Sequence, residues 1–127
     1  MIKGIEHIAV CAKDTKALAE WYVKMFGWRI VQDNGKGNYF VKAADGAMIE
    51  VMASNGQEFT SGLFDGGIRH IALSISSYHF DAMVTKLKNA GVEIVTDVTV
   101  SDTGIKTFFF KDIEGNIFHL IYRPVGL

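Results

Sequence analysis

Apolar and polar residues alternate along the start of the chain, and this pattern predicts a half-buried strand over residues 5–11. Ile8 and Val10 lie on one side of this strand, whereas His7 lies on the other. The alternation recurs around His70, which again lies opposite the apolar positions. The chain therefore presents a histidine-bearing strand twice.

Two segments carry apolar residues at the spacing of amphipathic helices. The first helix is predicted to begin after Asp14, which is a good N-cap, and to end at Gly27. The second is predicted to end at Gly91. The apolar stripes consist of Ala17, Leu18, Trp21, Tyr22 and Met25 in the first helix and of Phe80, Met83, Val84 and Leu87 in the second. Each helix thus offers one apolar side for packing against a sheet.

Three further strands are predicted after each helix, because runs rich in apolar residues alternate with turns that contain glycine. They cover about 28–33, 38–43, 47–53, 92–99, 105–111 and 116–122. Each half therefore has the order βαβββ, and we predict an α+β fold of two such modules. The modules span about 1–53 and 68–127, and a glycine-rich linker spans 54–67.

The two halves also repeat in amino-acid sequence. Residues 5–10 and 68–73 are identical at four of six positions, with an offset of 63. A second block, which begins at residue 39 in the first half and at residue 108 in the second, repeats with an offset of 69. These registers pair His7 with His70 and Glu50 with His119.

Composition narrows the class of ligand. The 127 residues are 49% hydrophobic and carry 13 basic and 14 acidic side chains, which suits one compact domain without a basic surface for nucleic acid or anionic membrane. A small molecule is therefore the expected partner. The apolar runs are too short to span a membrane, and a single cysteine, Cys11, excludes an internal disulfide. We expect a cytoplasmic protein.

Three of the four histidines fall at repeat-related strand positions, and the fourth such position holds an acid. The set is His7, Glu50, His70 and His119. A carboxylate or imidazole between apolar strand neighbours is costly to desolvate unless it is paired or binds a metal. Three imidazoles and one carboxylate suit one divalent transition metal, namely Zn²⁺, Ni²⁺, Fe²⁺, Co²⁺ or Mn²⁺. A pairing role alone stays open for Glu50, and His79 on the second helix is expected to be solvated or to neighbour the helix cap.

Five further residues are candidates for binding a substrate. Met48 and Met52 lie on the same side of their strand as the acid, and they either line an apolar cleft or belong to a core. Phe59 and Phe64 in the linker either close over a ligand or plug the seam between the modules. Arg123, near the C-terminus, either contacts an anionic group or is solvated.

These features resemble the vicinal oxygen chelate superfamily, which includes glyoxalase I, bleomycin and fosfomycin resistance proteins, extradiol dioxygenases and methylmalonyl-CoA epimerase. The resemblance rests on the two βαβββ halves, the His-Ile-Ala motif that opens each, and the Asp-Ile-Glu-Gly-Asn-Ile-Phe-His-Leu stretch near the end. It covers nearly the whole chain. It implies a curled mixed sheet with the helices outside and a divalent metal on the concave face. The implied ligands are His7, Glu50, His70 and His119.

The resemblance also implies an activity. A glyoxalase I-like (lactoylglutathione lyase-like) isomerase or lyase would move a proton on a small vicinal-oxygen substrate, such as an α-oxo aldehyde–thiol adduct. The metal would act as a Lewis acid, and Glu50 or His119 would act as the base. Glyoxalase I-like members typically have glutamate at both last-strand positions, and this chain departs from that pattern at His119.

Three alternatives stay open: an iron-dependent extradiol dioxygenase, a fosfomycin thiol transferase, and a metal-free protein of the bleomycin-resistance type that sequesters a drug. Extradiol members usually carry four modules, and fosfomycin-modifying members usually have glutamate where this chain has His119. Sequestering members usually lack the ligand set. We expect a homodimer, with the site formed either within one chain or between two.

Overall fold

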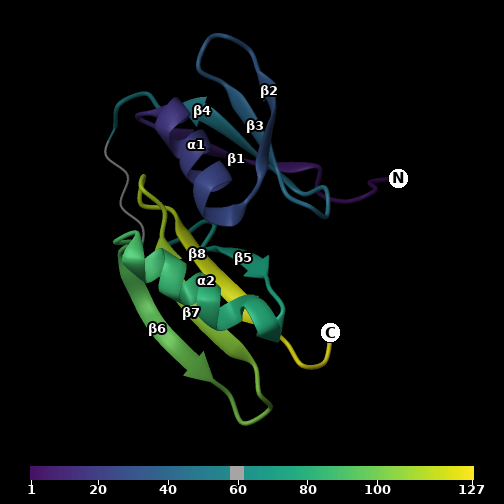
Figure 1. The fold of residues 1–127 in the computed structure, drawn as a ribbon. Helices are drawn as coiled ribbons and strands as arrows, with labels where there is room; N and C mark the ends of the chain where they lie inside the picture. Colours follow the sequence, from purple (N-terminus) through teal and green to yellow (C-terminus); the bar gives the residue numbers. More distant parts are fainter. Residues whose placement is uncertain (58–61) are drawn as a thin grey trace. The chain divides into compact units, whose positions relative to one another are not determined.

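The computed structural model describes residues 1–57 and 62–127. The chain divides into two compact units, Met1–Glu58 and Phe59–Leu127. Each unit contains one helix and one four-stranded mixed sheet in the order βαβββ, and each helix lies across one face of its own sheet (Figure 1). The predicted α+β fold with two βαβββ modules is confirmed.

The first unit consists of β1 (His7–Ala12), α1 (Thr15–Phe26), β2 (Arg29–Asp33), β3 (Tyr39–Lys42) and β4 (Met48–Ala53). Its strand order is β1-β4-β3-β2, with β1 parallel to β4 and the other pairs antiparallel. The helix begins as predicted, because the Asp14 carboxylate accepts a hydrogen bond of 3.0 Å from the Ala17 amide. It ends at Gly27, whose φ of 70° lies in the left-handed region that favours glycine.

The core of the first unit lies between α1 and one face of the sheet. Alternation along β4 sets this face, since Ile49 and Val51 are buried whereas Met48 and Glu50 are half-buried on the opposite side. The buried apolar set is Val10, Ala12, Leu18, Ala19, Tyr22, Met25, Val41, Ile49 and Val51. The face of the sheet away from α1 is therefore left for side chains that do not belong to this core.

The second unit consists of β5 (Ile71–Ser74), α2 (Ser77–Asn89), β6 (Ile94–Val100), β7 (Lys106–Lys111) and β8 (Ile117–Tyr122). Its strand order, β5-β8-β7-β6, repeats that of the first unit, and β5 is parallel to β8. His70 was predicted to lie within a strand, but β5 begins at Ile71, so this histidine immediately precedes the strand. His79 is exposed on α2 as predicted, and its Nδ1 lies 2.9 Å from the Ser76 hydroxyl.

The core of the second unit is built on aromatic residues. Phe108, Phe110 and Phe118 are fully buried, and successive rings stack with centroids 5.8 and 6.0 Å apart. On the α2 side, the predicted stripe residues Phe80, Val84 and Leu87 are buried with them, whereas the fourth, Met83, is half-buried. Four consecutive residues of β8 are buried, which means that both faces of this strand are covered at that point.

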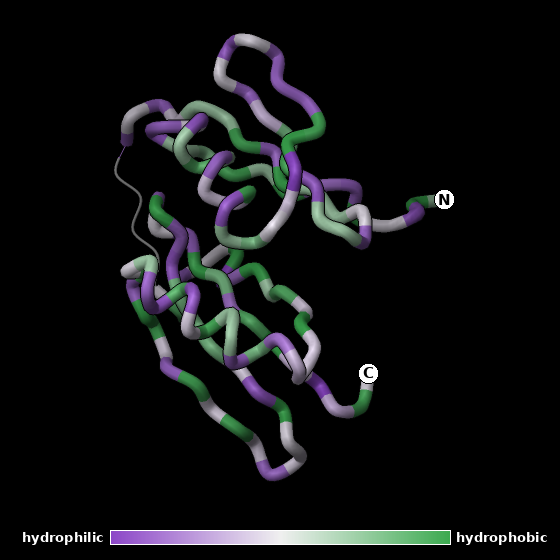
Figure 2. Tube along the Cα trace, viewed as in Figure 1, coloured by the Kyte–Doolittle hydropathy of each residue, from purple (hydrophilic) through white to green (hydrophobic). Residues whose placement is uncertain are grey.

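The hydropathy of the chain differs between turns and strands. The turn between β2 and β3 is hydrophilic, whereas β6 contains both apolar and polar residues along its length (Figure 2). Within the described part of the chain, neither helix is long and apolar enough to cross a membrane.

Candidate metal centre

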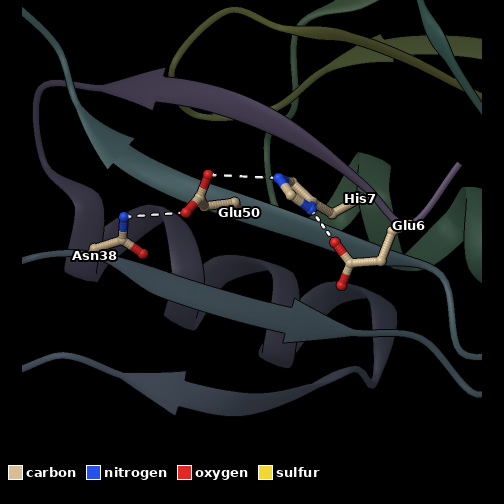
Figure 3. Close-up of polar contacts among 4 residues, drawn as sticks. All are labelled: Glu6, His7, Asn38 and Glu50. Atoms are coloured by element: carbon tan, nitrogen blue, oxygen red, sulfur yellow. Dashed lines mark hydrogen bonds and ion pairs between the residues drawn. The ribbon is translucent and has the colours of Figure 1, made fainter.

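The first unit brings His7 and Glu50 together on the face of its sheet away from α1. Ala9 lies opposite Glu50 in the parallel pairing of β1 and β4. His7 stands two residues before Ala9 and therefore projects to the same side as the carboxylate. The distance from His7 Nε2 to Glu50 Oε1 is 3.6 Å (Figure 3).

Each member of this first pair has an outer partner. His7 Nδ1 donates a hydrogen bond to the Glu6 carboxylate, and Asn38 Nδ2 donates one of 3.2 Å to Glu50 Oε2. The four side chains lie in a row across the sheet (Figure 3). The hydrogen bond to Glu6, together with the negative charges of Glu6 and Glu50, raises the pKa of His7 above its usual value of 6.5.

The second unit brings His70 and His119 together in the corresponding register. Ala72 lies opposite His119 in the parallel pairing of β5 and β8, and His70 stands two residues before Ala72. The two imidazole rings meet edge to face, with centroids 4.5 Å apart. The sequence repeat that relates His7 to His70 therefore corresponds to two side-chain clusters, one in each unit.

A phenylalanine supports each cluster at the same place. Phe40 lies opposite Glu50 in the β3–β4 pairing, and Phe109 lies opposite His119 in the β7–β8 pairing. The Phe40 ring contacts the His7 ring at a centroid distance of 5.2 Å. The Phe109 ring contacts the His70 ring at 5.4 Å, and both contacts are edge to face. These rings fix one side of each imidazole.

The second pair is surrounded by positive rather than negative charge. Arg69 donates from Nε to the Leu63 carbonyl at 2.6 Å and from Nη1 to His70 Nδ1 at 3.3 Å. Burial, and then the Arg69 charge, lower the pKa of His70. Burial also lowers the pKa of His119 to about 4, with further contributions from the charges of His70, Arg69 and Arg123. Both imidazoles are therefore neutral at pH 7, as metal ligands must be.

The depressed pKa of His119 predicts a pH dependence of folding. Between its usual value of 6.5 and about 4, the unfolded chain binds a proton on this imidazole that the folded chain does not. The free energy of unfolding of the metal-free protein should therefore fall as the pH drops through this window, by up to about 3 kcal/mol. Urea unfolding in EDTA at a series of pH values measures the slope.

Two variants control this measurement. His119→Gln removes the titrating group and should flatten the dependence, whereas His79→Gln changes an exposed histidine and should retain it. An unchanged slope in His119→Gln would show that this imidazole is not its source.

Each of the two residue pairs offers donor atoms for a transition metal ion. A gap of 3.6 Å between His7 Nε2 and Glu50 Oε1 can be spanned by two ligand bonds of about 2.0–2.2 Å. His119 is only 6% exposed, and its Nδ1 has no hydrogen-bond partner among the described residues. A buried ring nitrogen left unsatisfied by the chain is costly unless it serves an ion or another ligand. Within either unit, the described residues contain no group of three or more His, Cys, Asp or Glu side chains that would hold a metal by itself.

The predicted substrate-binding residues have different surroundings. Met48 is half-buried and Met52 is 39% exposed, beside Glu50 on β4. Phe64 is 90% exposed, and the Arg69 guanidinium lies 5.1 Å from its ring centroid. Arg123 is exposed just after β8, and its positive charge contributes to the lowered pKa of His119 on that strand. The remaining candidate, Phe59, lies outside the described residues.

Sequence reasoning missed five residues of these clusters. They are Glu6, Asn38, Phe40, Arg69 and Phe109. A signal existed for four of them, since Glu6 and Arg69 occupy the same place in the first repeat block and the two phenylalanines the same place in the second. Asn38 had none, because its role depends on a contact between neighbouring strands.

Solved structures share this fold at low sequence identity. A glyoxalase/dioxygenase from Nostoc punctiforme matches with a TM-score of 0.82 and 18% identity, over 97% of this chain and 92% of that one. A variant of the fosfomycin resistance protein FosX from Listeria monocytogenes, in complex with Mn(II) and 1S,2S-dihydroxypropylphosphonic acid, matches with a TM-score of 0.78 and 23% identity, over 98% and 94%. The oxidase ChaP-H2 matches with a TM-score of 0.77 and 22% identity, over 99% and 98%.

At these identities the likeness establishes the fold. The family is established by a sequence model that matches residues 4–120 and therefore includes both histidine motifs, all of β4 and β8 as far as Leu120. The chain belongs to the Glyoxalase/Bleomycin resistance protein/Dioxygenase superfamily.

Proposed function

We propose that this chain is a divalent-metal-dependent enzyme of the glyoxalase I type, which transfers a proton on a small vicinal-oxygen substrate. One observation carries the proposal: two repeat-related residue pairs, one of imidazole and carboxylate and one of two imidazoles, stand at matching positions of the two units. Their four donor groups suit one Zn²⁺, Ni²⁺, Fe²⁺, Co²⁺ or Mn²⁺ ion. His7, Glu50, His70 and His119 are the proposed ligands.

His7, Glu50, His70 and His119 would hold the cation, and its Lewis acidity would acidify the carbon next to a bound carbonyl. The chain supplies the base that removes the proton and returns it to the adjacent carbon. Glu50 suits this role better than His119. Its side chain is 17% exposed and borders the half-buried Met48 and the exposed Met52, whereas His119 is buried and surrounded by positive charge that opposes its protonation.

Charge around the second pair supports a substrate that carries a negative group. The positive charges of Arg69 and Arg123 both act on His119. A guanidinium binds carboxylate and related oxyanions with several parallel hydrogen bonds. We therefore propose that Arg123, which is exposed, contacts an anionic part of the substrate, while Met48, Met52 and Phe64 line its apolar part.

The two pairs belong to different units, so one ion needs both units. We propose a homodimer in the cytoplasm, with each ion held either by the two units of one chain or by units of two chains. Sedimentation with and without metal measures the oligomeric state.

The decisive experiment is elemental analysis of protein purified without added metal, followed by turnover of a hemithioacetal after loading with Ni²⁺ or Zn²⁺. We expect about one transition metal per chain and metal-dependent turnover, as the four-ligand site requires. Stoichiometric metal without turnover would indicate another metal enzyme of the superfamily. Absence of metal binding, combined with tight binding of a drug-sized ligand, would indicate a sequestering protein and overturn the proposal.

A further inference from the structure

Two side chains outside the proposed ligand set hold the first pair in place. We propose that Glu6 and Asn38 are positioning residues, which leave His7 Nε2 and Glu50 Oε1 as the free donor atoms that face each other. This inference rests on the proposed metal-binding function. Its basis is the row Glu6–His7–Glu50–Asn38 across the face of the first sheet away from α1 (Figure 3).

Glu6 determines which nitrogen of His7 carries the proton. An ionised carboxylate can only accept hydrogen bonds, so the His7 nitrogen that contacts it, Nδ1, must be the donor. In the neutral imidazole the lone pair then lies on Nε2, which is the atom 3.6 Å from Glu50 Oε1. A carboxylate on the second nitrogen of a metal-binding histidine fixes its tautomer and orientation in this way.

Asn38 determines which oxygen of Glu50 is free. Its amide donates to Oε2, so Oε1 keeps its lone pairs for the side that faces His7. Asn38 is itself fixed by the turn between β2 and β3, because its backbone amide donates to Asn34 Oδ1 at 3.1 Å and its carbonyl accepts from the Asn34 amide at 3.2 Å. The turn between β2 and β3 therefore sets the rotation of the Glu50 carboxylate on β4.

The second unit provides an internal contrast. Arg69 occupies the repeat position of Glu6, and a guanidinium can only donate, so His70 Nδ1 must accept and neutral His70 carries its proton on Nε2. The two repeat-related histidines should therefore differ in tautomer in the metal-free protein. Only the first pair is preorganised to present an Nε2 lone pair.

Nitrogen-15 NMR of the metal-free protein, at a pH where the histidines are neutral, reads these tautomers directly. We expect His7 to be protonated on Nδ1 and His70 on Nε2. In Glu6→Ala, His7 should lose its strict preference for Nδ1–H, and Glu6→Gln, which keeps an acceptor oxygen, should restore part of it. Asn38→Ala should leave both tautomers unchanged. A wild-type His7 protonated on Nε2 would overturn the role of Glu6.

Titration calorimetry with Zn²⁺ supplies the second readout. Glu6→Ala and Asn38→Ala should each weaken Zn²⁺ binding about 10–100-fold, which is typical of outer partners of metal ligands. Glu20→Ala, which alters an exposed acid on α1, and Asn89→Ala, at the end of α2, should bind as wild type does.

The outcomes separate the two proposals. If wild type binds Zn²⁺ and both variants bind it equally well, the positioning role is wrong and the proposed function stands. If wild type binds no Zn²⁺, Ni²⁺ or Mn²⁺, the proposed function itself is wrong. A backbone NMR spectrum of each variant checks that the fold is retained. Substitution of Glu6 should leave the fold intact, because its side chain is 68% exposed.

Discussion

His7→Ala and His119→Ala are each expected to lose stoichiometric metal, with affinity at least about 100-fold weaker than wild type. The loss should exceed the 10–100-fold effect of an outer partner, because a direct ligand bond disappears. The variants remove one imidazole from each unit. Elemental analysis after purification and titration with Zn²⁺ against a competing chelator measure the effect.

The comparison between these two variants tests whether one ion needs both units. Equal losses support a single site that includes both pairs. Loss in His7→Ala alone would show that the first pair holds the metal without the second, which contradicts the four-ligand proposal. His119→Gln repeats the test without leaving a large cavity in a buried position, and His79→Ala, on the exposed side of α2, should retain full metal content.

Glu50→Gln is expected to lower kcat by about 10²–10⁴, the usual contribution of a general base. Glutamine keeps the shape of the side chain and one acceptor oxygen, which can face either His7 or Asn38 but not both, and it cannot take up a proton at neutral pH. Turnover of the hemithioacetal is measured at saturating metal, so that weaker metal binding does not contribute to the result.

Controls for this variant separate proton transfer from metal binding. Glu20→Gln removes an acid on the exposed side of α1 and should leave kcat unchanged. If Glu50→Gln retains wild-type kcat when fully loaded, Glu50 is not the base and His119 becomes the remaining candidate. If Glu50→Asp recovers part of the rate while Gln does not, the carboxylate itself is the required group.

Local sequence signals predicted the elements closely, because each signal corresponds to a local physical cause. The α1 boundaries follow from the Asp14 cap and the left-handed Gly27, and both act within one turn of the helix. The strands follow from alternation, and the seven strands with predicted bounds are observed within two residues of them, whereas β5 begins only after His70. Of the predicted apolar stripe of α1, Leu18, Tyr22 and Met25 are fully buried, whereas Ala17 and Trp21 are half-buried.

Burial on the two sides of a strand was harder to predict. Alternation predicts one covered face, and β4 follows this rule, with Ile49 and Val51 buried and Glu50 half-buried. β8 does not, since His119 is as buried as its apolar neighbours. Alternation cannot predict this, because coverage of the second face depends on residues far away in the chain.

The sequence alone determined the duplicated βαβββ architecture and the two histidine–partner pairs, because strand parity and an internal repeat fix which residues share a face and a register. Tertiary structure decided what those pairs are. Contacts across strands gave His7 a carboxylate on its Nδ1, gave His70 a guanidinium instead, and placed His119 in a buried setting that keeps it neutral. Side-chain charge and solvation at a site depend on neighbours in space, and a one-dimensional pattern does not record them.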